Sequence, residues 1–344
     1  MVFSVEECLR IKDNFAQHAH IPSNLIVGKK PLMRPRFTVA IPTYKRVATL
    51  KDTISSALSQ TFKNFNIIVV DNNPEREDET ELYMKSLNHE KIQYYKNAEN
   101  LQMFGNWNRC ALLSNADYFI LIHDDDIMLP DFLSDCDRLL NETPDADVIG
   151  FHCYTWRQKD IDERIPTIKY NYKDKFFYWK PQKFIAPYIR TFTPTGVLLR
   201  KDKVIKIGGW ENDSFPVLDL FFEVKVSPYF NVYLYEKVEY IYRWAVNESI
   251  KVDNIRKWID YEPELIKYVS RKLHIPSLIS DTKIKLLVDF RLSQLKTMFP
   301  DYYASLDLSD FNVPTTRSQK KRCIVLVKYA IRFFKIKKYL FHKL

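Results

Sequence analysis

Short apolar runs alternate with amphipathic helical patterns between residues 37 and 130, and this alternation restricts the chain to few folds. Each run has the length of a buried strand, and a helical pattern separates it from the next run. Strands that alternate with helices at this spacing predict an α/β fold with a mostly parallel, doubly wound sheet. The strand-like runs fall at residues 37–42, 67–70, 92–95 and 120–122.

Polar side chains follow three of these runs: Thr43 with Tyr44, Asp71 with Asn72, and the run 124–126 of three aspartates. In open α/β sheets, ligands bind beyond the carboxyl ends of the strands. Three adjacent carboxylates repel one another unless a cation neutralises them, and hard oxygen ligands suit Mg²⁺ or Mn²⁺. The run therefore indicates a divalent ion that carries substrate phosphates, with a solvated acidic loop as the alternative.

A nucleotide fits such an edge. A carboxylate such as Asp71 can accept a hydrogen bond from a ring N–H of uracil or guanine, and Tyr44 can stack on the base. The sequence contains no GxGxxG or GxxxxGK[ST] loop, so the phosphates would be neutralised by metal. The same absence weighs against a nucleotidyltransferase. Taken singly, each residue could instead be a polar strand cap.

The 344-residue chain is globular in composition, with 46% hydrophobic and 28% charged residues. Its formal net charge of +9 is concentrated after Phe311, where no Asp or Glu occurs, so we expect no nucleic-acid partner. No apolar stretch approaches the roughly 20 residues of a membrane span, and the N-terminus lacks a signal-peptide core, which predicts a cytoplasmic protein. The 5 cysteines form no CxxC pair and indicate reduced thiols.

Several blocks together resemble family 2 glycosyltransferases with the GT-A fold, over about residues 36–245. These blocks are residues 38–46, residues 67–71, Asn100 with Gly105 and Asn108, and residues 124–127. The ordered set is far more specific than any single block. The resemblance implies an inverting transfer from a nucleotide-sugar, with a DXD-type motif that holds Mn²⁺ or Mg²⁺ on the donor diphosphate.

The same resemblance assigns roles to individual residues. Asp125 is the best match to the metal ligand, Asp124 is next and Asp126 completes the set. The usual first Asp of the family falls on His123 here, which shifts weight to Asp124. Arg243 matches an Arg or His that closes over the diphosphate. The expected donor-binding residues are Pro42, Thr43, Tyr44, Arg46, Asp71, Asn100, Asn108, Asp124 and Arg243.

The expected general base lies in the second half of the chain. Asp219 stands in an otherwise apolar helix start, where a carboxylate is costly to bury unless it is partnered or functional. The Glu-Asp pair of the family aligns with Leu218 and Asp219, and its second acid is the one that would deprotonate the acceptor hydroxyl. Glu223, one turn later, is the alternative base. The non-catalytic alternative for Asp219 is a helix N-cap.

We expect four segments. Residues 1–35 form an N-terminal helix and linker, residues 36–250 the GT-A domain, residues 251–313 a helical cap, and residues 314–344 a basic amphipathic helix. That last helix can lie in an anionic membrane interface or can dock on the protein. The aromatic-rich stretch 154–192 can cover an acceptor sugar, although an irregular packed insertion is favoured.

These observations predict a metal-dependent inverting glycosyltransferase at the inner face of the cell membrane. The expected donor is a UDP-sugar, and the expected acceptor is a hydroxyl of a glycan or lipid-linked oligosaccharide in surface polysaccharide (capsule) synthesis. The missing first Asp and the missing acid at Leu218 leave an alternative. In that alternative the protein is a catalytically weak nucleotide-sugar-binding or membrane-associated assembly partner.

Overall fold

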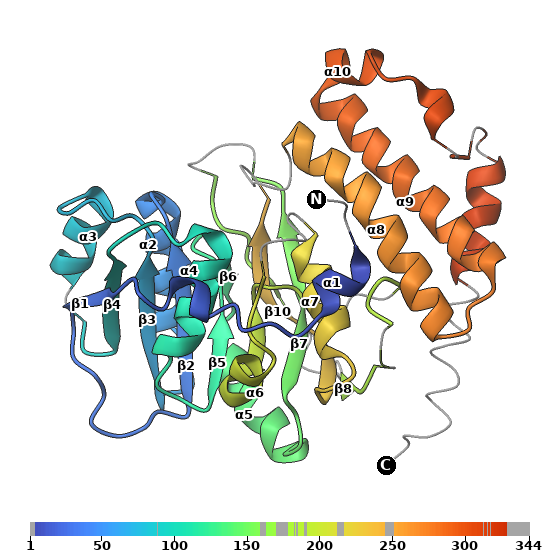
Figure 1. Cartoon of the computed structure of the whole chain (residues 1–344). Helices are drawn as coiled ribbons and strands as arrows, with labels where there is room; N and C mark the ends of the chain where they lie inside the picture. The colour runs from blue at the N-terminus through green and yellow to red at the C-terminus, as the bar shows by residue number, and fades with distance from the viewer. Residues whose placement is uncertain are drawn as a thin grey trace.

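A ten-stranded mixed sheet runs through the computed structural model, with helices on both faces and a helical unit at one end (Figure 1). The strand order is β1-β4-β3-β2-β5-β9-β7-β10-β6, and β8 pairs with β10. The structure describes residues 4–328 except 88, 159–162, 170–177, 182, 184, 189–190, 212–216, 245–250, 312, 315 and 317.

The first half of the chain is the expected strand and helix alternation. Strands β4, β3, β2 and β5 are parallel neighbours, so their carboxyl ends share one edge of the sheet. The elements are β2 (Phe37–Thr43), α2 (Val47–Leu58), β3 (Phe65–Asp71), α3 (Glu79–Leu87), β4 (Ile92–Asn97), α4 (Gln102–Leu113) and β5 (Tyr118–Leu121).

Both faces of the central strands are apolar, as buried parallel strands require. On β3, Ile67 and Val69 belong to one core with helices α2, α3 and α5 (Phe132–Glu142). Ile68 and Val70 belong to a second core with α4, α6 (Lys201–Lys206) and α7 (Leu218–Val226). The two helix layers therefore fix the sheet and the direction in which its carboxyl edge points.

The second half continues the sheet with mixed strand directions. Strand β9 (Val197–Arg200) runs antiparallel between β5 and β7 (Val148–Trp156), and β10 (Val232–Arg243) is parallel to β7. The far end of β10 also pairs with the short β6 (Ile127–Met128). This pairing brings the end of β10 beside the loop between β5 and β6.

The N-terminal segment packs along the domain. Helix α1 (Val5–Leu9) contributes Val5 and Cys8 to a core with α7 and α8, and it lies beside α7 in Figure 1. The expected linker contains a strand, β1 (Ser23–Val27), which pairs antiparallel with β4 at the sheet edge. The apolar pattern of residues 23–27 is short and irregular and did not predict a strand. The strand forms because these residues pair with the exposed edge of β4.

The helical cap consists of α8 (Val252–Lys272), α9 (Ser277–Met298) and the short α10 (Pro300–Ala304), at the opposite end of the molecule from β1 (Figure 1). In the stretch between β7 and β9, Ile185, Ala186 and Tyr188 pack into the α7–α8 core. The described part of that stretch is thus a packed insertion. Strand β8 (Tyr178–Trp179) also belongs to it.

The final helix is described over residues 318–328, and residues 329–344 lie outside the described part of the chain. Val327 is buried, and Lys320 forms an ion pair with Asp289 of α9. This first part of the predicted amphipathic helix therefore docks on the protein. Among the described helices, none combines the length and the apolar character of a membrane span.

Candidate active site at the carboxyl edge of the sheet

Three neighbouring strand ends and one loop form the candidate site. Thr43 of β2, Asp71 of β3 and Lys96 of β4 lie in register across the sheet. The loop that follows β5, residues 123–126 and here named the acid loop, meets them through Thr43, whose Oγ1 donates to Asp124 Oδ2 at 2.7 Å. The strand order therefore brings the expected polar clusters together.

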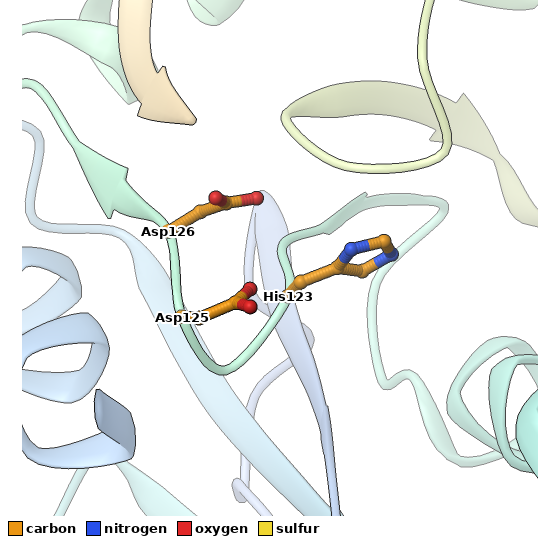
Figure 2. Close-up of side chains that lie close together, drawn as sticks. All are labelled: His123, Asp125 and Asp126. Carbon is orange, nitrogen blue, oxygen red and sulfur yellow. The ribbon is translucent and has the colours of Figure 1, made fainter. Parts of the chain in front are cut away.

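Two aspartates of the acid loop lie with His123 in a possible metal-binding group. Figure 2 shows His123, Asp125 and Asp126 on one loop, with both carboxylates directed toward the His123 side of the loop and the imidazole directed away from them. One ligand atom from each lies within 4.8 Å of the others. Asp124, in contrast, faces β2 and accepts from the hydroxyl of Thr43 and the backbone N–H of Tyr44.

Asp126 also connects three distant segments. Its Oδ2 accepts from Thr195 Oγ1 at 2.6 Å, and its Oδ1 accepts from the backbone N–H of Arg243 at 3.0 Å. Thr195 Oγ1 in turn accepts from the backbone N–H of His123 at 3.0 Å. The buried carboxylate of Asp126 thus fixes the acid loop against the turn before β9 and the end of β10.

The acid loop carries more negative than positive charge. Among the described residues, the basic side chain paired with these aspartates is Arg46, whose Nη1 lies 2.9 Å from Asp125 Oδ2 and 3.6 Å from Asp124 Oδ1. Burial, together with the charge of Asp125, raises the pKa of Asp124 to about 7 and raises that of Asp126 well above its usual value. Three carboxylates face one guanidinium, so without a cation the buried Asp124 and Asp126 favour their protonated forms, and a divalent cation would favour their ionised forms.

His123 offers a nitrogen ligand in the neutral form of its imidazole. Its ring stacks on Trp107, with the ring centroids 5.1 Å apart. Burial lowers the pKa of His123 to about 4, so the imidazole is neutral and can ligate a metal. Within the described chain, its buried Nε2 has no hydrogen-bond partner. The donor set of carboxylates and a neutral imidazole suits Mn²⁺, and the residues present therefore fit the implied metal.

Asp219, in the first turn of α7, acts electrostatically on the acid loop. Its negative charge acts to raise the pKa of His123, against the larger lowering effect of burial. Its Oδ1 accepts from the backbone N–H of Leu220 at 2.8 Å. The N-cap residue of α7 is Val217, so the N-cap interpretation of Asp219 is wrong.

Glu223, the alternative base, is directed elsewhere. It is buried, and its Oε2 accepts from the backbone N–H of Thr191 at 2.9 Å and from Thr191 Oγ1 at 2.8 Å. It lines a small cavity with Lys180 and Lys183. The described contacts of Glu223 are therefore with Thr191 and not with the acid loop.

A second carboxylate cluster surrounds Asp71, and its charges balance. Asp71 is fully buried and accepts from Tyr94 Oη at 2.6 Å, Lys96 Nζ at 3.1 Å and the backbone N–H of Asn73 at 2.9 Å. Burial raises the pKa of Asp71, and these three partners oppose the rise. The members of this group, named the Asp71 cluster, are Asp71, Asp78, Glu81, Arg76, Lys85 and Lys96.

Two expected donor residues make contacts within the protein. Asn108 is buried, and its side chain donates to the carbonyl of Trp210 and accepts from the N–H of Trp210, both at 2.9 Å. Gly209 has a φ of +69°, and a Cβ there would lie 2.2 Å from Asn108 Oδ1, so only glycine allows this contact. Asn100 Oδ1 accepts from Asn72 Nδ2 at 2.8 Å.

The other expected donor residues differ in exposure. Tyr44 is 45% exposed at the open edge, whereas Pro42 is buried within β2. The Arg243 guanidinium donates to Asp52 Oδ2 at 2.7 Å and lies over the ring of Trp156. Of this group, Tyr44 is the side chain most accessible to a base.

Sequence reasoning missed Tyr94, Lys96, Thr195 and the ring of Trp107. Lys96 had a usable signal, because a lysine inside an otherwise buried strand requires a carboxylate partner. Thr195 had none, since its partner Asp126 lies 69 residues away. The stacking of Trp107 on His123 likewise depends on tertiary contact.

Comparisons with known proteins agree with this geometry. Residues 38–208 match the family model described as Glycosyl transferase family 2. The Campylobacter jejuni GalNAc(5)-diNAcBac-PP-undecaprenol beta-1,3-glucosyltransferase is 31% identical over 111 residues, which is 31% of this chain and 35% of that protein. The chain spans 32% of the length of two other curated glycosyltransferases that it matches, and 58% of a third.

Solved structures share the fold at low sequence identity. Staphylococcus aureus TarS 1–349 in complex with UDP-GlcNAc has a TM-score of 0.53 at 15% identity, covering 84% of this chain and 79% of that one. Mannosyltransferase PcManGT from Pyrobaculum calidifontis in complex with GDP-Man and Mn²⁺ has a TM-score of 0.50 at 12% identity, covering 96% and 93%. The predicted GT-A fold with a helical C-terminal extension is confirmed.

Proposed function

This chain is a family 2 glycosyltransferase, and from that premise we propose that it transfers a sugar from a UDP-sugar, with inversion and with a divalent cation, to a hydroxyl of a glycan or lipid-linked acceptor. The observation that carries the proposal is the group of three carboxylates in the acid loop that a single guanidinium faces among the described residues. The loop lies where the carboxyl ends of the parallel strands meet, and the charge of Asp219 acts on His123 of that loop.

The cation, Mn²⁺ or Mg²⁺, would be held by Asp125 with Asp126 and His123, and when bound it supplies the positive charge that stabilises a leaving nucleoside diphosphate. PcManGT, a neighbour of the same fold, is described with GDP-Man and Mn²⁺, which supports a metal site of this kind. Asp124 orients Thr43 and the Tyr44 backbone, so we assign it to shaping the donor pocket.

Asp219 is the proposed general base. A carboxylate that takes the proton of the acceptor hydroxyl permits direct attack on the anomeric carbon, and the sugar is transferred with inversion. Asp219 lies in the first turn of α7, and its electrostatic effect on His123 supports this role. Inversion in a single displacement requires no covalent enzyme intermediate.

The nucleobase is assigned to the region of Tyr44. Tyr44 is exposed at the edge of the sheet and can stack on a base. Asp71 is fully buried and bonded to Tyr94, Lys96 and Asn73, so we assign it to supporting this edge from beneath. TarS, of the same fold, is described with UDP-GlcNAc, which supports a uridine donor.

The acceptor is proposed from chemistry and from the relatives. The name of the Campylobacter relative describes an acceptor linked to undecaprenyl diphosphate, so a lipid-linked saccharide in surface polysaccharide synthesis is a reasonable acceptor class. The basic residues after position 311 would bring the enzyme to an anionic membrane surface on the cytoplasmic side.

The test is a donor screen followed by product analysis. The protein is incubated with a panel of UDP- and GDP-sugars, with Mn²⁺ or with a chelator, and thermal stabilisation is measured. A UDP-sugar that stabilises only with metal is then offered to lipid-linked acceptors, and NMR reads the anomeric configuration. Stabilisation indifferent to metal, or a product that retains the donor configuration, would refute the proposal. Binding without transfer to any acceptor would support the assembly-partner alternative.

A further inference from the structure

Arg46 pairs with a carboxylate that a cation would need. It is the N-cap residue of α2, and its Nη1 lies 2.9 Å from Asp125 Oδ2 and 3.6 Å from Asp124 Oδ1. Asp125 belongs to the group that could hold a metal, with His123 and Asp126. The guanidinium and a divalent cation therefore compete for the same carboxylate.

The competition is electrostatic as well as steric. A guanidinium that donates to a carboxylate forms a charge-assisted hydrogen bond, which is among the stronger contacts of a protein surface. It also reduces the negative charge of the acid loop from three to two. Both effects weaken the attraction of the loop for a cation, so Arg46 opposes metal binding while it remains on Asp125.

The Arg46 side chain can leave this position without disturbing the helix. It is 38% exposed, and α2 is anchored at this end by the backbone, because the Arg46 carbonyl accepts from the N–H of Leu50 at 3.0 Å. The side chain of Arg46 makes no capping hydrogen bond to α2. Movement of the guanidinium therefore leaves this backbone hydrogen bond of the helix in place.

A diphosphate is the partner that would draw Arg46 away. Guanidinium groups bind phosphate oxygens in a bidentate manner, and Arg46 lies at the loop where the donor diphosphate is assigned. The other nearby basic groups are engaged, since Arg243 pairs with Asp52 and Lys45 pairs with Glu75. We propose that Arg46 couples the two ligands: it holds Asp125 until a nucleoside diphosphate arrives, and then moves to the phosphates and yields Asp125 to the cation.

This inference rests on the proposed function, and it has a thermodynamic consequence. Arg46 would weaken binding of the metal alone and strengthen binding of the metal together with the diphosphate. Each ligand must then increase the affinity for the other by the same factor. Binding of either ligand alone is then weak. The coupling would keep the enzyme from holding a cation without its donor.

The experiment measures Mn²⁺ affinity by electron paramagnetic resonance of free Mn²⁺, with and without UDP. It uses the full chain as wild type, Arg46→Ala, Arg46→Gln and the control Lys51→Ala, and a parallel series uses GDP. Lys51 is an exposed lysine of the same helix, so its removal changes the net charge equally. Thermal unfolding of each variant checks the fold.

For wild type we expect UDP to tighten Mn²⁺ binding by about 10- to 100-fold. Without UDP, both Arg46 variants should bind Mn²⁺ about three- to tenfold more tightly than wild type, because the competing guanidinium is gone. With UDP they should bind it less tightly than wild type. Lys51→Ala should follow wild type in both conditions.

Two results would overturn the inference while leaving the proposed function intact. In the first, the Arg46 variants match wild type with and without UDP, so Arg46 affects neither ligand. In the second, they bind Mn²⁺ more tightly by the same factor in both conditions, which is simple charge repulsion without transfer to the phosphates. If wild type binds no Mn²⁺ with either nucleotide, the proposed function itself fails, and this inference fails with it.

Discussion

The Asp71 cluster and the acid loop lie at the same edge of the sheet, and each contains three carboxylates. In the Asp71 cluster these are matched by three cations, Arg76, Lys85 and Lys96, at 2.8 to 3.7 Å. In the acid loop one arginine, Arg46, is paired with them among the described residues. The first cluster is neutral and the second is short of two positive charges.

The difference separates structural charge from functional charge. Hydrogen bonds from Arg76 hold the pKa of Glu81 well below its usual range, so the Asp71 cluster gains stability from its ionised carboxylates. Burial raises the pKa of Asp124 and Asp126, so these carboxyl groups favour their protonated forms until a cation stabilises the ionised forms. Substitutions in the two regions should therefore affect different measurements.

The largest effect is expected for Asp219→Asn, opposite the acid loop. Turnover should fall about 10²- to 10⁴-fold because the amide cannot take the acceptor proton, and metal-dependent UDP binding should persist. Steady-state kinetics measures the turnover, and nucleotide titration measures metal-dependent UDP binding. Glu223→Gln, which keeps an oxygen for Thr191, serves as the control and should retain most of the turnover. Equal losses in both variants would remove Asp219 from the base role.

Lys96→Met should show the structural character of the Asp71 cluster. Lys96 is 2% exposed and contacts Asp71, Asp78 and Glu81, so its loss leaves buried carboxylates uncompensated at a cost of about 3–5 kcal/mol. Lys85→Met, at a site 42% exposed, should cost less than about 1 kcal/mol. Urea denaturation measures both values. A small loss for Lys96→Met would mean that the cluster is not a structural unit.

Asp125→Asn should show the opposite character of the acid loop. Mn²⁺-dependent UDP binding should weaken by about 10- to 100-fold, as for the loss of a metal-site group. The melting temperature should stay equal to that of wild type or rise, because the substitution removes the Asp125 charge that disfavours ionised Asp124 and Asp126. Calorimetric titration measures UDP binding, and thermal unfolding measures the melting temperature. Destabilisation with unchanged binding would assign Asp125 to the structure instead of the site.

The smallest expected effect is a pH dependence of the Asp71 cluster. The folded pKa of Glu81 lies below its ordinary value of 4.5, so ionised Glu81 contributes stability above pH 4.5 that is lost as the pH falls through the folded pKa. Thermal unfolding of wild type and Glu81→Gln should differ at pH 7 and converge in acid. A gap that persists unchanged at pH 3 would contradict the contribution of charge.

Much of the fold was predictable from local pattern. The apolar runs and the helical periods between them predicted β2, β3, β4 and β5 and the parallel order, because each strand of a buried sheet must be apolar on both faces. The strand β1 was not predicted, since five residues with mixed exposure become a strand only by pairing with the edge of β4. The site followed the same division: Thr43, Arg46, Asp124 and Asp125 were predicted as site residues, while the contacts that join them in pairs were not.

The sequence by itself determined the succession of strands and helices along the chain. It also determined that Thr43, Asp71 and the acid loop follow the ends of strands, because those features depend on residues close together in the chain. Only the tertiary structure decided the charge balance. Arg46 faces Asp125 across 79 residues, and Thr195 bonds to Asp126 across 69. Electrostatic free energy depends on distances in space, and the packing of strands and helices sets those distances.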